Sequence, residues 1–448
     1  MRVAVHTAKA EVRAMRISIR FLAFALANAP AGAAPLNDSG QITCYGAAGA
    51  VGTVSPVMPN PSPASHAGQD CTHGRAAADA LGALARIGAG VHGFDYTKIA
   101  NDGRELPVDA PLGSGPADWA CTRDNRTGLL WEVKTSSGAR RVDFSYTWFD
   151  TDPERNGGVA GSTGSETCGG SLPFGACNTS AFVQAVNQSA LCGQVDWRMP
   201  RLAELQSIAD YERGSPPYED PQFFAESAPT TYWSGQNYAG NPQVAHVFRA
   251  DPNVDRAETK TSPHPVRLVR GTLPPAGGAC VPGNSRIAPD ARYLDHADGT
   301  VSDLQTGLMW KRCAEGQSGT QCSGIANQYT EWHQALAAAR GQSFAGHQDW
   351  RLPNVKELQS LAETACTDPS INSNRFPGTP ASHFWTSTAV SATGAQAWLV
   401  RFDDAGIVGD DESNDHGHVR LVRAGTGQDG FDSADPVLAD GFEDSAGR

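Results

Sequence analysis

The chain has 448 residues, of which 40% are hydrophobic, and it carries a formal net charge of −13 at pH 7. This length suits more than one core of ordinary domain size. The negative charge argues against a nucleic-acid partner, because phosphate binding requires a basic surface.

The first 34 residues have the pattern of an export signal. Arg13, Arg16 and Arg20 precede the apolar run 21–27, and small residues follow through Ala34. The run is shorter than the roughly 20 residues that span a bilayer, and no later segment is long enough. A cleaved signal is therefore the favoured interpretation, with an N-terminal membrane anchor as the alternative. We expect a secreted, periplasmic or cell-surface protein.

Residues 35–117 are interpreted as a Pro/Gly-rich leader followed by an N-terminal extension. The stretch 35–70 lacks apolar periodicity, which predicts a mobile leader without a core. An Ala/Leu-rich stretch at 75–87 predicts a helix, and the run 94–99 predicts a strand that enters a turn. We expect the extension to pack on the domain that follows.

The rest of the chain is a tandem duplication. Residues 350–360 (WRLPNVKELQS) repeat residues 197–207 (WRMPRLAELQS) 153 positions later, and three further blocks recur in the same order. A repeat of this size indicates two copies of one domain. We place the copies at 118–271 and 280–425, joined by a linker at 272–279 and followed by an acidic, disordered tail at 426–448. The first copy has 26 additional residues, around a Gly/Ser/Thr-rich loop.

Both copies predict the same order of elements. A short apolar run ending in Trp131 or Trp310 predicts a buried strand. Helical periodicity then predicts a helix at 180–191, and its counterpart at 331–340 is expected to be capped by Thr330. The tail of each copy is predicted to be strand, and we expect each copy to close its own hydrophobic core.

The repeated stretch itself predicts an extended segment and then a second helix. Asn354 and Glu357 have capping-box spacing, so they predict where this helix begins in the second copy. Arg201 stands in place of Asn354, and we expect the first copy to lose the box although Glu204 remains.

Tryptophans and arginines that recur between the copies form a structural motif. We expect the tryptophans to lie in the cores. Each arginine is expected to satisfy loop carbonyls, with a ligand contact as the alternative. The motif comprises Trp131, Trp197, Arg198, Trp233, Trp310, Trp350, Arg351 and Trp385.

These paired blocks resemble the C-terminal domain family of Legionella collagen-like proteins, in two tandem copies. The resemblance implies an α+β fold of two C-type-lectin-like domains, each with two helices and a twisted antiparallel sheet that carries long loops. It also implies a surface or secreted bacterial module, and in the named adhesins such domains are associated with binding of sulfated polysaccharides and host surfaces. This chain differs from those adhesins because it has no Gly-x-y repeat and both copies are acidic.

Ten cysteines in an exported chain predict disulfides. Two pairs are close enough in sequence to close locally, and the other six cysteines are grouped by segment, although the sequence leaves their connectivity open. The local pairs are Cys168–Cys177 and Cys313–Cys322, and the grouped pairs are Cys44–Cys71, Cys121–Cys192 and Cys280–Cys366. No spacing typical of zinc sites occurs.

Two candidate ligand-binding features remain. Loop aromatic residues are candidates for a platform that stacks on sugars, although for one more of them, Trp332 at the start of a predicted helix, a core position is favoured. An acidic hairpin offers the oxygen ligands that calcium prefers, with a solvated hairpin as the alternative. The aromatic candidates are Tyr146, Trp148, Phe149 and Tyr329, and the calcium candidates are Asp403, Asp404, Asp410, Asp411 and Asp415. No other cofactor is expected.

We therefore expect a non-catalytic extracellular binding or adhesion module that recognises a polysaccharide or a host or matrix surface. One alternative is a structural envelope protein without a small ligand. Another, by analogy of fold alone, is an oxidase of the formylglycine-generating type. Such oxidases need a pair of reduced cysteines, so the number of free thiols separates these classes. No catalytic residues are predicted, because no nucleophilic triad is recognisable.

Overall fold

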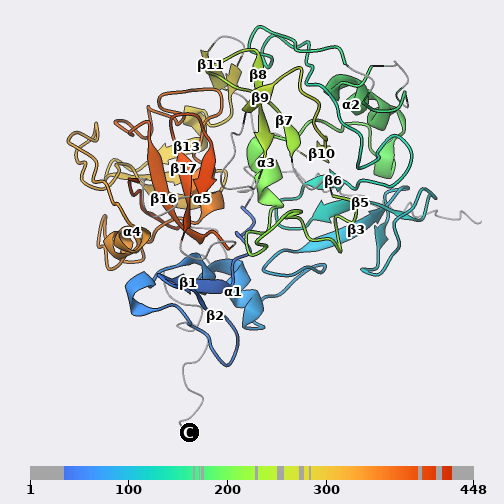
Figure 1. Cartoon of the computed structure of the whole chain (residues 1–448). Coiled ribbons are helices and arrows are strands. Elements are labelled where there is room, and N and C mark those ends of the chain that lie inside the picture. The colour runs from blue at the N-terminus through green and yellow to red at the C-terminus, as the bar shows by residue number, and fades with distance from the viewer. Residues whose placement is uncertain are drawn as a thin grey trace, which may run out of the picture. The chain divides into compact units, whose positions relative to one another are not determined.

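The computed structural model of the chain (Figure 1) describes residues 35–164, 167–170, 172, 176–227, 231–249, 257–271, 277–281, 284–391, 396–409 and 416–425. The predicted export signal and the acidic tail lie outside these residues. The described chain is α+β, with short helices and antiparallel strand ladders. None of its helices combines the length and the apolar character that crossing a membrane requires.

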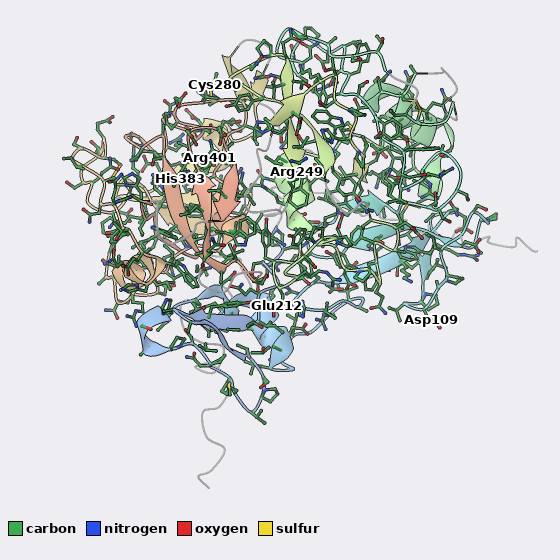
Figure 2. All side chains as sticks on the ribbon, viewed as in Figure 1. Asp109, Glu212, Arg249, Cys280, His383 and Arg401 are labelled. Carbon is green, nitrogen blue, oxygen red and sulfur yellow. A yellow bond between two sulfur atoms is a disulfide. The ribbon has the colours of Figure 1, made fainter. Side chains whose placement is uncertain are left out.

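The N-terminal segment is folded, so the prediction of a mobile leader without a core is wrong. A hairpin of two strands is linked by the Cys44–Cys71 disulfide to the 3₁₀ turn that precedes α1, and Val54 and Ala77 pack around that bridge. Glu212 of the first repeat accepts from Thr43 N–H at 3.1 Å, beside this hairpin (Figure 2). Its elements are β1 (Thr43–Gly46), β2 (Gly49–Thr53), 3₁₀ turns at Ala64–His66 and Asp70–Thr72, and α1 (Gly74–Ala80).

The first repeat contains two antiparallel sheets and two helices. The predicted strand of the extension forms β3 and pairs with β5, so the extension does pack on the first repeat. The larger sheet has the order β10-β6-β5-β3-β4, and the smaller has the order β7-β8-β9. The elements are β3 (Tyr96–Ala100), β4 (Glu105–Leu106), β5 (Trp119–Asp124), β6 (Leu130–Glu132), α2 (Thr179–Gln188), a 3₁₀ turn (Leu191–Gly193), α3 (Leu202–Ser207), β7 (Tyr232–Asn237), β8 (Val244–Phe248), β9 (Ala257–Thr259) and β10 (Val269–Arg270).

The second repeat has the same plan behind a small linker hairpin. Its sheets have the orders β13-β14-β15-β19 and β16-β17-β18. The elements are the linker strands β11 (Gly277–Val281) and β12 (Asn284–Arg286), then a 3₁₀ turn (Asp290–Arg292), β13 (Tyr293–Asp295), β14 (Thr300–Asp303), β15 (Leu308–Lys311), α4 (Trp332–Ala339), α5 (Val355–Gln359), β16 (His383–Ala389), β17 (Ala397–Arg401), β18 (Ile407–Gly409) and β19 (Val422–Ala424).

The recurring tryptophans occupy matching surroundings, as a duplication requires. Trp233 Nε1 donates to the Tyr146 carbonyl at 2.7 Å, and Trp385 Nε1 donates to the Tyr329 carbonyl at 3.0 Å. All six tryptophans of the predicted motif are buried, each at most 2% exposed. The prediction that they form the cores is therefore confirmed.

The main partner of each recurring arginine is a carboxylate, and its contact with a carbonyl is weaker. Arg198 makes two hydrogen bonds of 2.7 Å with Glu204, and Arg351 makes the same fork with Glu357 at 2.7 and 2.6 Å. Each also reaches a carbonyl of the adjacent residue at 3.3 or 3.4 Å, so the predicted carbonyl contact exists but is the weaker one. A bidentate guanidinium–carboxylate pair fixes the turn between the extended segment and the helix.

The capping box begins α5 as predicted. Asn354 Oδ1 accepts from Glu357 N–H at 2.9 Å, and Glu357 accepts from Asn354 N–H at 2.8 Å. In the first repeat Glu204 still accepts from Arg201 N–H at 2.7 Å, but a guanidinium has no acceptor atom, so half of the box is lost. Thr330 does not cap α4, because that helix begins one residue later than expected, with Glu331 as its N-cap.

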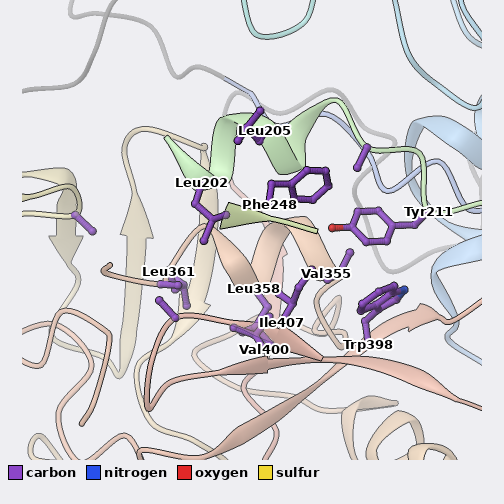
Figure 3. Packing of buried hydrophobic residues seen from close by; sticks show 14 of the residues in the cluster. Leu202, Leu205, Tyr211, Phe248, Val355, Leu358, Leu361, Trp398, Val400 and Ile407 are labelled. Carbon is purple, nitrogen blue, oxygen red and sulfur yellow. The ribbon is translucent and has the colours of Figure 1, made fainter. Parts of the chain in front are cut away.

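The two repeats do not each close their own interior, which corrects that expectation. Each has a private core, around Phe182 in the first repeat and Leu336 in the second. A third cluster is shared, because α3 and α5 pack against each other between the sheets. Figure 3 shows Leu205 and Phe248 of the first repeat facing Leu358 and Val400 of the second.

The N-terminal segment joins this shared region through a buried lysine. Lys356 Nζ donates to the Asp38 carbonyl at 2.6 Å and to the Ser207 carbonyl at 2.9 Å, so one side chain ties together the leader and both repeats. It also lies 4.5 Å from the centre of the Phe94 ring. Burial lowers the pKa of Lys356 and raises that of Asp38.

The structure contains the disulfides in the grouping that the sequence suggested. They link Cys44–Cys71, Cys121–Cys192, Cys168–Cys177, Cys280–Cys366 and Cys313–Cys322, which accounts for all ten cysteines.

Candidate functional site

A cavity of about 560 Å³ opens beside the first repeat. Its walls come from the loop inserted in this repeat between Trp148 and α2, the first turn of α2, the repeated Trp-Arg-Met-Pro-Arg stretch, β7, the linker strand β12 with Ile287, and the residues Thr364 and Ala365 that follow α5. The lining residues used below are Trp148, Phe149, Asp150, Asp152, Glu154, Arg155, Ser180, Val183, Arg198, Met199, Arg201, Gln236, Asn237, Ser285, Arg286, Ile287 and Thr364.

The inserted loop forms one wall and is held in place from below. Trp148 is 1% exposed at the base of the loop, and its Nε1 donates to the Ser234 carbonyl at 3.0 Å. Lys260 lies 4.3 Å from the centre of the Trp148 ring and donates to the Asn156 carbonyl at 2.8 Å. Burial lowers the pKa of Lys260 to about 8. The described residues at the start of this loop therefore form one wall of the cavity.

The repeated stretch and β7 form the opposite wall. Leu202 N–H, the first amide of α3, donates to Gln236 Oε1 at 2.7 Å, so a side chain from β7 caps this helix. Gln236 Nε2 donates to Thr364 Oγ1 of the second repeat. Asn237 is 4% exposed, and its Oδ1 has no hydrogen-bond partner among the described residues.

The linker and the second repeat complete the cavity. Ser285 N–H in β12 donates to the Glu154 carbonyl at 3.2 Å, so the linker hairpin meets the inserted loop. Glu363 accepts from the N–H groups of Ile287 and Ala288 at 3.0 and 2.7 Å, which fixes the linker on the second repeat. The first repeat by itself does not contain all the walls of this cavity.

Charges of both signs line the cavity. Asp150, Asp152 and Glu154 come from the inserted loop, and Arg155 of the same loop pairs with the two aspartates at 3.0 and 2.6 Å. Three further arginines, Arg198, Arg201 and Arg286, come from the other walls. Burial lowers the pKa of Arg201, yet an arginine remains charged at neutral pH.

The corresponding face of the second repeat is covered by the N-terminal segment, drawn in blue in Figure 1. Asn354, the counterpart of Arg201, donates to Asp38 at 3.2 Å. Thr388, the counterpart of Gln236, donates to Asp70 at 2.6 Å. One repeat thus presents an open cavity, and in the other the chain's own residues fill the same position.

A second contact of this kind lies at the end of β16. Ala389 N–H, at the position equivalent to Asn237, donates to Gln41 Oε1 at 2.8 Å, and the Ala389 carbonyl accepts from Gln41 Nε2 at 2.9 Å. The His66 ring lies 5.6 Å from that of Trp332. Trp332 donates to the Thr386 carbonyl as Trp148 does to the Ser234 carbonyl, and the two tryptophans follow the equivalent residues Tyr329 and Tyr146 by three and two positions.

The predicted aromatic platform is wrong for Tyr146 and Trp148, which are 0% and 1% exposed and belong to the core of the first repeat. Phe149 is half-buried and does line the cavity. Tyr329 is half-buried against the core of the second repeat, away from the cavity. These residues look like loop aromatics in the sequence, but the inserted loop begins only after Trp148.

Sequence reasoning missed Arg201, Gln236 and Arg286 as cavity residues. Arg201 carried one visible signal, because it departs from Asn354 inside a stretch that is otherwise closely repeated. Nothing comparable marked Gln236 or Arg286, whose position depends on the packing of the linker against both repeats.

Of the five candidate calcium ligands in the acidic hairpin, the structure describes Asp403 and Asp404. Arg401, at the end of β17 (Figure 2), pairs with Asp403 at 3.1 Å and Asp404 at 2.8 Å, so its guanidinium takes up both carboxylates. Asp410, Asp411 and Asp415 lie outside the described residues. The part of the chain that the structure describes holds no cluster of three or more His, Cys, Asp or Glu side chains suited to a metal ion.

Comparison with protein families matches the Lcl C-terminal domain to residues 120–270 and 299–423. These two regions cover more than half of the chain and coincide with the two repeats. Neither the comparison with curated proteins nor the comparison with solved structures gives a match.

Proposed function

The chain belongs to the Lcl C-terminal domain family, and from this premise we propose that it is an exported, non-catalytic module that binds an extracellular polysaccharide in the cavity of its first repeat. A disulfide-rich chain of this family suits a secreted or surface-exposed protein. The proposal rests on the cavity of the first repeat. At the equivalent position of the second repeat, the N-terminal segment covers the surface.

The lining of the cavity supports a saccharide ligand. Its size lies in the range of ordinary ligand pockets. Phe149, Val183 and Met199 offer apolar surface, while Gln236 and Asn237 offer amide groups. A sugar ring presents hydroxyl groups that donate and accept, and a hydroxyl donor would satisfy the unpaired Asn237 Oδ1.

The disulfides support the absence of catalysis. An oxidase of the formylglycine-generating type needs two reduced cysteines, and every cysteine of this chain is paired in the structure. The other alternative, a structural envelope protein, is distinguished from a binding module by whether the cavity takes a ligand.

Screening the whole disulfide-bonded chain on a polysaccharide array tests the proposal. Ser180, in the first turn of α2, lines the cavity, so Ser180→Trp places an indole there. Gln188 is exposed at the other end of the same helix, and Gln188→Trp is the matched control. We expect the wild type and Gln188→Trp to bind the same glycans and Ser180→Trp to lose them, with equal thermal stability.

Two results would contradict this function. If the wild type binds no polysaccharide, with or without calcium, the structural alternative is preferred. If Ser180→Trp binds as the wild type does, the ligand lies elsewhere on the molecule.

Calcium is a separate proposal that depends on Asp410, Asp411 and Asp415, because Arg401 takes up the two aspartates before them. Calorimetric titration of the whole chain tests it. Heat in the micromolar to millimolar range supports a calcium site, and a flat trace removes it.

A further inference from the structure

The second repeat has a counterpart of the cavity, and this counterpart is almost completely filled. About 10 Å³ of space remains in it, whereas the cavity of the first repeat has about 560 Å³. The smaller space holds at most about one water molecule. Both spaces are lined by residues at the same positions of their repeats. These pairs, with the first repeat named first, are Arg198 and Arg351, Met199 and Leu352, Arg201 and Asn354, and Gly235 and Ser387.

The N-terminal segment fills this counterpart. Its residues Gly68, Asp70, His73 and Gly74 line the remaining space from the other side. Gly74 has a φ of +73°, and a Cβ there would meet Asp38 Oδ2 at 2.5 Å, so the segment can follow this path only with glycine at that position. The chain's own residues therefore stand where the first repeat has open space.

The segment also covers the aromatic wall of the counterpart. Phe149, which lines the open cavity, stands three positions after Tyr146, and Trp332 stands three positions after the equivalent Tyr329. Trp332 is 1% exposed, and the ring of His66 from the segment lies 5.6 Å from its ring. Without the segment, the second repeat would present an aromatic face beside the repeated stretch, as the first repeat does.

Only non-covalent contacts hold the segment on the second repeat. The Cys44–Cys71 disulfide closes the segment on itself, and the remaining eight of the ten cysteines pair with one another in the linker and the repeats. Residues 82–88, which connect the segment to the first repeat, form neither helix nor strand and are mostly exposed. The segment can therefore leave the second repeat as a disulfide-closed unit without the breaking of a covalent bond.

The groups that the segment binds are neutral hydrogen-bonding groups. The Gln41 side chain pairs with the N–H and the carbonyl of Ala389 at 2.8 and 2.9 Å. The hydroxyl of Thr388 donates to Asp70 at 2.6 Å. Sugar hydroxyl groups both donate and accept, so a saccharide can make the same contacts with this surface.

We propose that the second repeat carries a second saccharide site, and that the N-terminal segment occupies this site and competes with the ligand. The inference rests on the proposed function, because the second site takes the same class of ligand as the first cavity. Saccharide and segment use one surface, so the apparent affinity of the second site is reduced by the fraction of chains in which the segment is displaced.

The test blocks the first cavity and weakens the contacts of the segment in the whole disulfide-bonded chain. Ser180→Trp fills the first cavity. Gln41→Ala combined with Asp70→Ala removes the hydrogen bonds of these two side chains to β16 and gives the loosened chain. Val57→Ala combined with Met58→Ala is the matched control, because these side chains of the same segment are 93% and 47% exposed.

All variants are screened on one array that carries cellulose, xylan, dextran, chitin, pectin and heparin. Ser180→Trp should bind none of these polysaccharides, either alone or with the control substitutions. With the loosening substitutions added, we expect binding to return, to the same polysaccharides that the wild type binds. Hydrogen exchange of the Ala389 N–H should become about tenfold faster or more, because this amide loses its partner on Gln41.

The outcomes separate the two proposals. If the Ala389 amide exchanges faster but binding does not return, the second site is overturned, while the function of the first cavity stands. If this exchange keeps its wild-type rate and binding is absent, the segment is a fixed part of the fold, which also overturns the competition. Binding by the loosened chain alone supports the second site and contradicts the function proposed for the first cavity. If neither the wild type nor the loosened chain binds any of the six polysaccharides, both proposals fail.

A second variant covers the case in which the loosened chain loses its fold. Loss of protection throughout α4 and β17 would show that the second repeat has unfolded. His66→Ala, which removes the ring that lies over Trp332, then replaces the paired substitutions in the same screen. Binding by His66→Ala in the Ser180→Trp background supports the second site, and absence of binding overturns it.

Discussion

Replacing Leu358 by alanine should destabilise both repeats, although Leu358 belongs to the second. Leu358 is 0% exposed on α5 and lies in the shared cluster, which also contains Leu205 and Phe248 of the first repeat. Removing a fully buried leucine side chain from a packed core lowers the free energy of unfolding by about 2–5 kcal/mol. The same substitution at Leu304, which is 52% exposed, is the control and should change it by less than about 0.5 kcal/mol.

Hydrogen exchange followed by mass spectrometry gives the assay, because it reports each repeat separately. We expect the slowest amides of α2 and β8 to lose as much protection as those of α4 and β17. If peptides from the first repeat keep wild-type protection in Leu358→Ala while those from the second lose it, the repeats unfold independently and the shared core does not couple them.

Three further predictions follow from the remaining contacts. Arg201→Asn should complete the capping box with Glu204 and raise the free energy of unfolding by about 1 kcal/mol, whereas Arg201→Ala should not, as calorimetry can show. Burial acts to lower the pKa of His92, but the hydrogen bond and charge of Asp210, 2.8 Å away, raise it overall. The stability that this pair contributes should therefore be fully present below the unfolded pKa of His92, near 6.5, and should be lost as the pH rises through the higher folded pKa. In urea titrations, the free energies of unfolding of wild type and His92→Gln should differ below this pH range and converge above it. Thiol titration of the denatured, unreduced chain should find no free thiol, and two reactive thiols would restore the oxidase alternative.

Features encoded in short stretches were predictable from the sequence. The capping box at Asn354 and Glu357, the buried strand at Trp310 and the local disulfide Cys313–Cys322 depend on residue types at short spacings, and the structure contains each of them. Such features are determined by residues that are close in sequence, so they form when the fold is compatible with them.

The order of the N-terminal segment could not be predicted in this way. Its contacts join residues about three hundred positions apart, such as Asp38 with Asn354 and Gln41 with Ala389. The stretch has no periodicity of its own, because it takes its conformation from the surface that it covers. For the same reason the cavity could not be predicted from the sequence, because its walls come from the inserted loop, the linker and both repeats. Among the lining residues, only Arg201 was marked in the sequence, by its difference from Asn354.

The duplication explains why the two copies are not interchangeable binding units. Separated from residues 35–74, the second repeat would expose Thr388 and Trp332, which the N-terminal segment now covers. Separated from the linker and from Thr364, the first repeat would lack two walls of its cavity. Glycan binding measured on separated repeats would therefore report surfaces that the intact chain does not present. The N-terminal segment covers the second repeat, and the second repeat in turn contributes Thr364 to the wall of the cavity in the first. A ligand of this cavity must therefore be sought with the whole chain.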